Sequence, residues 1–215
     1  MSKRQKSVIT IICLLLVLVL GGAIGVYAYL IDRDSAANTF TVGKVEITLD
    51  EEDIDESSIG PRDKQNIYKM IPGEELKKDP LVTVKGRSHA SWVFVEVIDN
   101  EVSYNGEKYQ ASDFLTYGIN QGADGWTKLD GVNNVYYYQA PATDTDFTLP
   151  NILIDNKVIV KSGISKDMFD NVAKEAVYPE LSFKAYAFQV KKGDTDGDGI
   201  VEEFTAEQAW EALHN

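Results

Sequence analysis

The sequence predicts an all-β protein, an antiparallel β-sandwich that carries two short helices. Three observations lead to this prediction. Runs rich in β-branched and aromatic residues recur along the chain, turn residues separate them about every ten residues, and only two stretches have helical spacing. The 215 residues are 44% hydrophobic and 26% charged, which is the composition of a foldable globular protein.

The N-terminus predicts an export signal. Three basic residues precede an uncharged apolar stretch at residues 8–31, which is the order of a secretory signal peptide. We expect cleavage after Ala28, with Val26 and Ala28 as the small residues that enter the peptidase pocket and Tyr29 as the new N-terminus. About 20 apolar residues are enough to span a bilayer, so an uncleaved membrane anchor stays open as the alternative.

The predicted domains are therefore a signal peptide or anchor at residues 1–28 and one sandwich domain at residues 29–215. Cys13 is the only cysteine and lies in the apolar stretch, so the exported part cannot form an internal disulfide. It keeps 18 of the 21 Lys and Arg and all 34 Asp and Glu, a formal charge of −16 (18 minus 34). Such a surface repels nucleic acid and anionic lipid, so nucleic acid is excluded and the membrane is reached only through residues 8–31.

The first strand is predicted at residues 39–49. The apolar phase changes at Gly43, which predicts a bulge or bend there. The apolar residues on the two sides of this change are Phe40, Val42, Val45, Ile47 and Leu49. Residues 50–56 follow with six carboxylates in seven positions and predict a surface loop; a calcium site there is the alternative, without the spaced glycine that such sites use.

The middle of the chain predicts a series of strands and tight turns. Residues 67–99 read as strand, Pro-Gly turn, strand, Gly-containing turn and strand, and Trp92–Ile98 is apolar on both faces except at Glu96, as in a central strand. Asn-Gly at residues 105–106 predicts a hairpin. Further strands are predicted at residues 135–140, 147–154 and 157–163. The first of these contains three consecutive tyrosines, for which we expect core packing on both faces with one exposed ring; a stacking platform for sugars or bases is the alternative.

The C-terminal part predicts two helices and a buried strand. A short helix is expected at residues 164–177, capped by Ser165, and a strand at residues 181–190. Thr205 and Gln208 have the spacing of a capping box, and the apolar residues of the last helix recur so that Trp210 and Leu213 should lie on the sheet.

The sequence shows no recognisable motif for hydrolytic catalysis. The exported part has no cysteine, no Gly-x-Ser-x-Gly elbow and no pair of histidines one helical turn apart. His89 in a predicted turn and His214 at the C-terminus are expected to be exposed. The sequence does not support the paired carboxylates of a glycosidase. Acidic residues are so frequent in this chain that two of them lying close together carries little information. We therefore expect that the protein is not an enzyme.

Residues 194–205 carry the sharpest local motif, a partial calcium loop. Its spacing places three carboxylates at positions 1, 3 and 5, glycine at position 6 and a backbone carbonyl at position 7. The candidate ligands are Asp194, Asp196, Asp198, Ile200, Glu202 and Glu203. Thr205 stands where a bidentate Glu belongs, so Glu202 or Glu203 would have to reach in, and a solvated acidic turn is the alternative. Calcium is the only cofactor that the sequence suggests.

Several stretches together resemble the TasA and camelysin family, proteins that Gram-positive bacteria export with a SipW-type signal peptide. VYAYLIDRDSAANTFTVGKVEITLDE is similar to the family's cleavage region and first strand. MIPGEELKKDPLVTV, WTKLDGVNNVYYY and LSFKAYAFQV with AEQAWEAL resemble its Pro-Gly turn and next strand, its tyrosine-rich hairpin, and its closing strand and helix. The resemblance extends over nearly the whole chain.

This resemblance implies a jelly-roll-like sandwich, removal of the leader by a SipW-type signal peptidase, and a place outside the cell. It also implies a structural protein of the biofilm matrix, in which an N-terminal strand of one subunit completes the sheet of the next or joins a sister matrix protein. On this sequence the donor strand would lie in residues 29–49. A monomeric membrane-anchored surface module that binds calcium is the alternative. Camelysin relatives are described as metallopeptidases, but no HExxH or paired histidines are present onto which a zinc site could be transferred.

Overall fold

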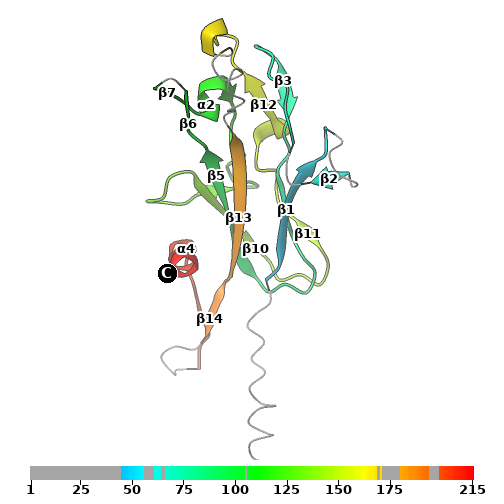
Figure 1. Ribbon diagram of the computed structural model, residues 1–215. Coiled ribbons are helices and arrows are strands. Elements are labelled where there is room, and N and C mark those ends of the chain that lie inside the picture. Colours follow the sequence, from blue (N-terminus) through cyan, green and yellow to red (C-terminus); the bar gives the residue numbers. More distant parts are fainter. Residues whose placement is uncertain are drawn as a thin grey trace, which may run out of the picture. The chain divides into compact units, whose positions relative to one another are not determined.

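The computed structural model describes residues 45–55, 61–63, 66–104, 106–168, 170, 180–193 and 199–215, all within a unit that spans Gly43–Asn215. Its strands are β1 (Ile47–Glu52), β2 (Arg62–Asp63), β3 (Glu75–Lys77), β4 (Leu81–Val84), β5 (Ser91–Asp99), β6 (Val102–Tyr104), β7 (Glu107–Tyr109), β8 (Leu115–Thr116), β9 (Thr127–Lys128), β10 (Val135–Ala140), β11 (Phe147–Thr148), β12 (Lys157–Val160), β13 (Leu181–Gln189), β14 (Lys191–Gly193) and β15 (Glu202–Glu203). The helical elements with defined bounds are α2 (Ala111–Phe114), the 3₁₀ turn η1 (Ile154–Asn156) and α4 (Ala206–His214). The pairings between these strands are antiparallel (Figure 1), which confirms the predicted all-β class.

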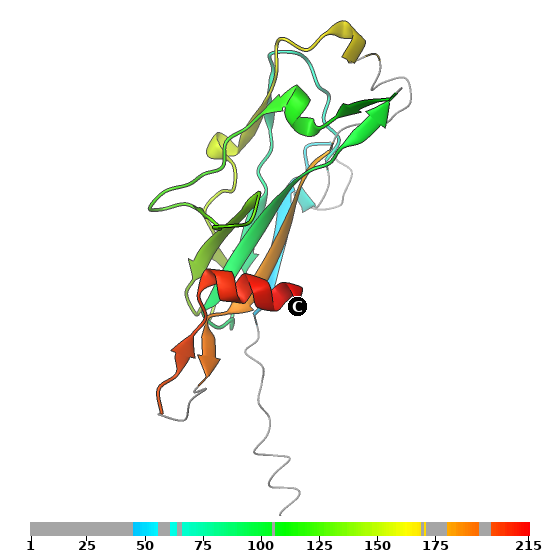
Figure 2. The same cartoon turned by 90° about the vertical axis from the view of Figure 1, so that its left-hand side faces the viewer.

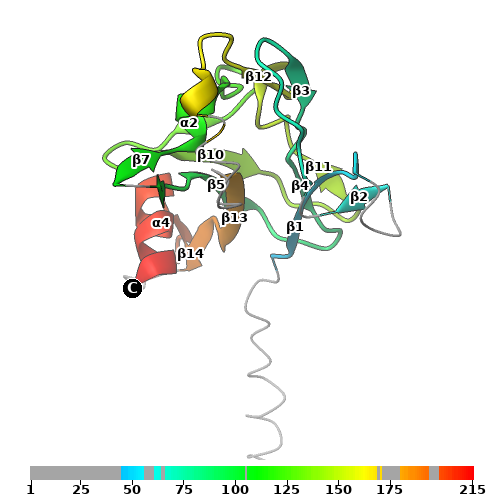
Figure 3. The same cartoon turned by 45° about the horizontal axis from the view of Figure 1, so that its top comes forward.

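Two four-stranded sheets share the main apolar core. One has the order β11-β4-β1-β2 and the other β13-β5-β10-β9 (Figure 3). Side chains alternate between the two faces of a strand, so one face of each sheet supplies apolar residues to this core. Its buried members are Val82, Val84, Val93, Val95, Trp126, Ala140, Leu149 and Ile152.

Strand β5 is the central strand that the sequence predicted. It pairs with β13 along nine residues on one side and with β10 along six on the other. Val93 and Val95 belong to the core that the two sheets share, whereas Phe94 belongs to a second core under α4. Because both faces of β5 are covered, its side chains are apolar at successive positions.

Helix α4 covers the second face of the β13-β5-β10-β9 sheet (Figure 2). The predicted capping box is confirmed: the Gln208 N–H donates to the Thr205 hydroxyl at 3.3 Å, and the Thr205 N–H donates to the Gln208 side chain at 3.2 Å. The Trp210 ring lies 5.3 Å from Phe94, and Leu213 packs on the same core. The predicted contact of this helix with the sheet is therefore confirmed.

The predicted turns are confirmed at two glycines that need a positive φ. Gly73 has φ +85° in the Pro-Gly turn, where the Glu74 N–H donates to the Ile71 carbonyl at 3.0 Å. Gly106 has φ +85° in the hairpin between β6 and β7. The strands that follow these turns complete a three-stranded sheet of order β3-β12-β8 and the separate β6–β7 hairpin.

Three strand predictions were wrong or too long. The strand predicted at residues 157–163 ends at Val160, as β12. Residues 66–71, before the Pro-Gly turn, form no strand. The strand predicted at residues 147–154 is reduced to β11, because Pro150 has no N–H to donate and the chain then turns through Asp155 and Asn156, both with positive φ. The short helix α2 was not predicted; four residues are too few to show a helical period.

The acidic stretch predicted as a surface loop at residues 50–56 begins inside β1, so the loop prediction was wrong for its first three residues. Asp50 pairs with Leu81, and the next two residues pair with β2. Arginine and lysine side chains on neighbouring segments form ion pairs with these carboxylates. A hydrophobicity pattern in the sequence does not predict such ion pairs.

The three tyrosines of β10 point to both faces, as predicted. Tyr136 and Tyr138 pack against the core that the sheets share, and Tyr137 packs against the core under α4, with its ring 5.6 Å from Trp92. None of the three is exposed, so the expected exposed ring was wrong. Of the helix predicted at 164–177, residues 166–168 are helical and the Met168 N–H donates to the Ser165 hydroxyl at 3.2 Å; the stretch 171–177 and the bulge predicted at Gly43 lie outside the described residues.

Candidate functional site

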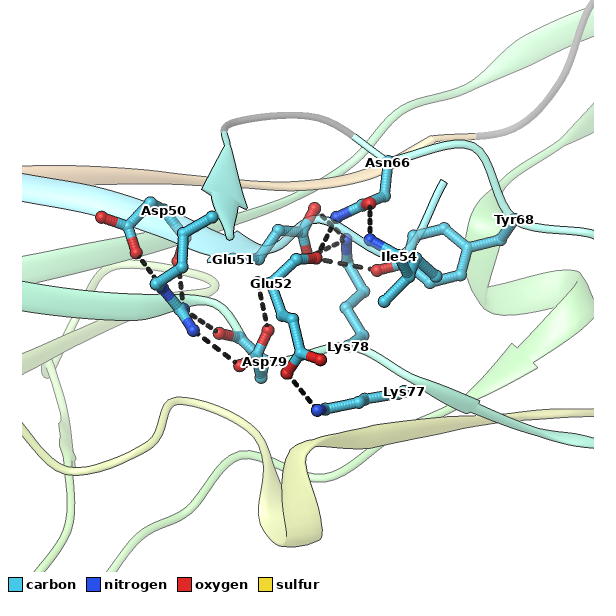
Figure 4. Close-up of polar contacts among 10 residues, drawn as sticks. Asp50, Glu51, Glu52, Ile54, Asn66, Tyr68, Lys77, Lys78 and Asp79 are labelled. Atoms are coloured by element: carbon cyan, nitrogen blue, oxygen red, sulfur yellow. Dashed lines mark hydrogen bonds and ion pairs between the residues drawn. The ribbon is translucent and has the colours of Figure 1, made fainter. Parts of the chain in front are cut away.

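The candidate site is a group of charged residues at the end of β1, which we call the polar clamp. Its members are Asp50, Glu51, Arg62, Lys78 and Asp79. They come from β1, β2 and the short link between β3 and β4, three segments that the sheet brings together (Figure 4).

Glu51 and Lys78 form a buried ion pair at the centre of the clamp. The Lys78 ammonium donates to both Glu51 carboxylate oxygens, at 3.2 and 3.1 Å, and each side chain is only 9% exposed. The Tyr68 hydroxyl donates to Glu51 Oε2 at 3.2 Å, and the Tyr68 and Phe183 rings lie 5.0 and 5.8 Å from the ammonium. Removing such charges from water is costly, so each of them depends on the other.

Arg62 holds the outer side of the clamp. Its guanidinium forms ion pairs with Asp50 and, at 2.9 Å, with Asp79, and it also donates to the backbone carbonyls of both residues at 3.1 Å. Partial burial lowers the pKa of Arg62, but the hydrogen bonds to the two carboxylates outweigh this effect and raise it above its ordinary value. Arg62 therefore stays charged and links β1 to the β3–β4 segment.

Backbone groups beyond the clamp are tied by side chains. The Glu52 N–H donates to Asp79 at 2.7 Å, and Asn66 bridges two backbone groups, donating to the Glu52 carbonyl and accepting from the Ile54 N–H, both at 2.8 Å (Figure 4). These bonds continue the ladder of β1 past the last strand residue. The chain is thus fixed at the point where β1 ends.

Chemically, the arrangement is suited to holding a strand. All three carboxylates of the clamp accept hydrogen bonds from Arg62 or Lys78, so they are engaged within the protein. Within the clamp, the two cations Arg62 and Lys78 are paired with the three carboxylates. These ion pairs connect the acidic end of β1 to β2 and to the segment between β3 and β4.

The predicted donor residues divide at the start of β1. Ile47 and Leu49 pair with Val84 and Val82 of β4 and pack, partly buried, against the main core, and Val45 lies just before them. Phe40 and Val42 lie outside the described residues. The second half of the predicted donor segment is therefore used in its own chain.

The predicted calcium loop joins β14 to β15. Asp194, Asp196 and Asp198 lie outside the described residues. Gly199 has φ +85°, Ile200 is exposed, and Glu203 pairs with Lys191 across the hairpin. Glu202 also forms an ion pair with Lys192 at 3.3 Å, so one of the two candidate acids already has a cation. The described residues contain no group of three metal-ligating side chains.

Of the remaining predicted positions, the two histidines lie within the described residues and the cleavage site does not. Val26, Ala28 and Tyr29 lie outside the described residues, as does the apolar stretch 8–31. Within the described ranges, no helix is long and apolar enough to cross a membrane. His89 and His214 are exposed, as predicted, and the His214 and Trp210 ring centroids are 4.0 Å apart with the ring planes tilted by 40°.

Sequence reasoning missed Arg62, Lys78 and Asp79. Their one signal was a charge pattern: a run of carboxylates followed by basic residues on two later segments.

No family model, curated protein or solved structure matches the chain.

Proposed function

We propose that the protein is a secreted or cell-surface structural protein of the extracellular matrix, of the kind that builds a biofilm, and that its copies assemble by N-terminal strand exchange. The resemblance to the TasA and camelysin family motivates this proposal. The same resemblance assigns the two packed sheets to a jelly-roll-like sandwich, the leader to a SipW-type peptidase, and the partner to a second copy or a sister matrix protein.

The observation that carries the proposal is the clamped strand β1. Its apolar side chains lie against the core and its acidic end is held by Arg62 and Lys78, so the chain before Val45 leaves from a fixed strand. A segment that joins two subunits must be attached to a strand that stays in its own domain. If β1 were released from its sheet, the two subunits would separate.

The donor is then assigned to residues 29–44. Because Ile47 and Leu49 already pair with β4, the residues that alternate into a neighbour would be Phe40 and Val42. These 16 residues reach roughly 50 Å when extended, enough for a strand of ordinary length and a linker. Backbone hydrogen bonds would supply affinity and the alternating side chains register.

This role requires no catalysis, and we propose that the protein is not an enzyme. The carboxylates of the clamp are engaged by cations of the same chain, which fits a structural role. A camelysin-like metallopeptidase stays the minor alternative; proteolysis by the purified protein that a chelator abolishes would establish it.

The first test is the N-terminus and intact mass of the protein from its native cells, separated into membrane and medium. A start at Tyr29 in the medium supports a secreted matrix protein. A start at Met1 or Ser2 in the membrane overturns it and favours the anchored module.

The second test compares assembly of proteins that begin at Tyr29 and at Val45. Both keep β1 and its clamp, so they differ only in the proposed donor. Fibres from the first protein alone support strand exchange, and equal assembly by both rejects it.

The alternative of an anchored, calcium-binding module is favoured by one observation, the positive φ of Gly199 at the glycine position of the calcium loop. Calorimetry with calcium on the wild type and on Asp196→Ala tests it. Heat from the wild type that the variant lacks supports a site, and no heat from the wild type rejects it.

A further inference from the structure

Strand β13 forms a long open edge of its sheet. It contains nine residues and pairs with β5 along its whole length, and among the described strands none pairs with its other side. The other outer strands of the two main sheets are β2, β9 and β11, and each of them has only two residues. A short outer strand limits pairing with another chain, whereas a long one is a template for it.

The backbone groups on the open edge follow from the hydrogen bonds at the two ends of β13. The Asn100 N–H donates to the Glu180 carbonyl at 3.1 Å, and the Val190 N–H donates to the Ala90 carbonyl at 2.9 Å. Successive residues of an antiparallel strand bond to opposite sides, so the even-numbered residues of β13 bond to β5. The odd-numbered residues direct their N–H and C=O groups to the open side. They are Leu181, Phe183, Ala185, Ala187 and Gln189.

Strand β13 has few of the features by which proteins protect an outer strand. Its register with β5 is continuous, so no bulge turns the edge away. Its sequence, LSFKAYAFQ, contains no proline and only one charged residue, Lys184. Because bulges, prolines and several charges are the usual means of blocking strand addition, this edge can accept another strand.

The main core is only partly covered where β13 faces β1, a border that we call the seam. The two strands lie side by side (Figures 1 and 3), and within the described residues β2 pairs only with the last two residues of β1. Beside β9 and β11, in contrast, Trp126 and Leu149 are at most 2% exposed and close the core. The core residues at the seam are all partly exposed. They are Ile47, Leu49, Phe183, Ala185 and Ala187.

We propose that the open edge of β13 accepts the donor segment, residues 29–44, of a neighbouring copy. This inference rests on the proposed function and adds the place where the strand binds. The odd-numbered residues of β13 supply the backbone hydrogen bonds, and Phe40 and Val42 of the donor cover the seam.

The length of the donor segment fits this edge. A strand of nine residues that ends at Val42 begins at Asp34, so the segment can pair with β13 along its whole length. Gly43, where the sequence predicts a bend, then lies between the donor strand and β1 of the same chain. The segment therefore supplies a full strand and a change of direction.

Strand direction favours a neighbouring copy over the same chain. Strands β1 and β13 run in opposite directions (Figure 1), so a segment that turned back from the start of β1 would run parallel to β13. A neighbour's segment can pair in the antiparallel sense, as β5 does on the other side of β13. Antiparallel pairing is slightly more stable per residue.

Proline substitution in the exported protein tests the open edge. Ala187→Pro removes an N–H that points away from β5, so the pairing within the sheet keeps its donors. Fibre formation should then need about ten times more protein. Lys128→Pro is the matched control: the Leu129 N–H donates to the Val135 carbonyl, so Lys128 directs its own N–H to the open side of β9. This control should assemble at the wild-type concentration, with circular dichroism reporting the folding of both variants.

Disulfide formation tests the same contact without a change of backbone. The exported part has no cysteine, so Thr41→Cys and Lys184→Cys give two proteins with one thiol each. When Phe40 and Val42 face the core, Thr41 lies on the same side of the sheet as Lys184. Facing residues of this type have Cα atoms about 4.5 Å apart, which a disulfide can bridge. An oxidised mixture should give the mixed dimer; Thr39→Cys covers the register two residues away, and Lys128→Cys in place of Lys184→Cys should give none.

The outcomes separate the acceptor edge from strand exchange itself. Normal assembly of Ala187→Pro without a mixed disulfide overturns the assignment to β13; if a protein starting at Val45 also fails to assemble, strand exchange stands with another acceptor. Normal assembly from Val45 rejects strand exchange. A disulfide that forms only within one chain carrying both cysteines shows that the segment covers its own β13, which overturns pairing between copies. If Ala187→Pro does not fold, the disulfide test decides alone.

Discussion

Replacing Lys78 by Met should destabilise the domain by about 3–5 kcal/mol, the usual cost of leaving one charge of a buried pair without its partner. Both side chains of the Glu51–Lys78 pair are 9% exposed, and the ammonium supplies two of the hydrogen bonds to the carboxylate. Met has a similar length and no charge. Glu51 would keep only the Tyr68 hydroxyl as its side-chain donor among the contacts described above.

The neighbouring residue offers a matched control. Lys77 forms an ion pair with Glu52, the next residue of β1, but these side chains are 52% and 46% exposed. Lys77→Met should therefore cost at most about 1 kcal/mol, as exposed ion pairs do. The two variants make the same chemical change on adjacent residues and differ in burial.

Urea denaturation followed by tryptophan fluorescence at pH 7 measures both free energies of unfolding. Replacing Glu51 by Met in the Lys78→Met variant should recover most of the loss, because no charge is then buried. Equal losses for the Lys77 and Lys78 variants would show that burial of the Glu51–Lys78 pair has no energetic consequence. A loss that the second substitution does not recover would also contradict the predicted cost of the unpaired charge.

Three further predictions concern the other end of the chain and the surface. Thr205→Ala should lower the free energy of unfolding by about 1 kcal/mol by removing the cap of α4, and an unchanged urea midpoint would contradict this. Burial and a hydrogen bond to Glu96 raise the pKa of Tyr186. The protonated Tyr186 hydroxyl therefore contributes fully to the free energy of unfolding below pH 10, and this contribution is lost as pH rises through the folded-state pKa. Glu96→Gln should move the Tyr186 titration, followed by NMR of the ring, to lower pH; no movement would exclude that cause. Assembly should need less protein in about 1 M than in about 0.01 M salt, because the Debye length falls from about 30 to about 3 Å; the reverse dependence would show that attraction between charges drives it.

The parts of the fold that follow from local patterns were predictable. Successive apolar residues at Trp92–Ile98 predicted the central strand, the capping box at Thr205 predicted the start of α4, and the Asn-Gly pair predicted a hairpin. Each signal depends on neighbours in sequence, so one sequence is enough to read it. Tyr137 shows the limit: alternation predicted the face on which it lies, but only the position of α4 decides whether that face is covered.

The candidate site could not be predicted, because long-range pairing creates it. DEEDIDE has the composition of a solvated loop, and the burial of Glu51 depends on Lys78, 27 residues away. Its neighbour Asp50 pairs with Arg62. Only the antiparallel register of β1 with β4 and β2 brings these charges together. The donor prediction was limited in the same way, since apolar alternation continues through Val45 and Leu49 whether the strand pairs within its own chain or with another.

The most direct measurement of strand exchange is binding of a labelled peptide of residues 29–44 to a protein that begins at Val45, once circular dichroism has shown that protein to be folded. Strand exchange predicts saturable binding with one peptide per domain, lost when Phe40 and Val42 are both replaced by Lys. Absence of binding, or equal binding of the two peptides, would contradict it.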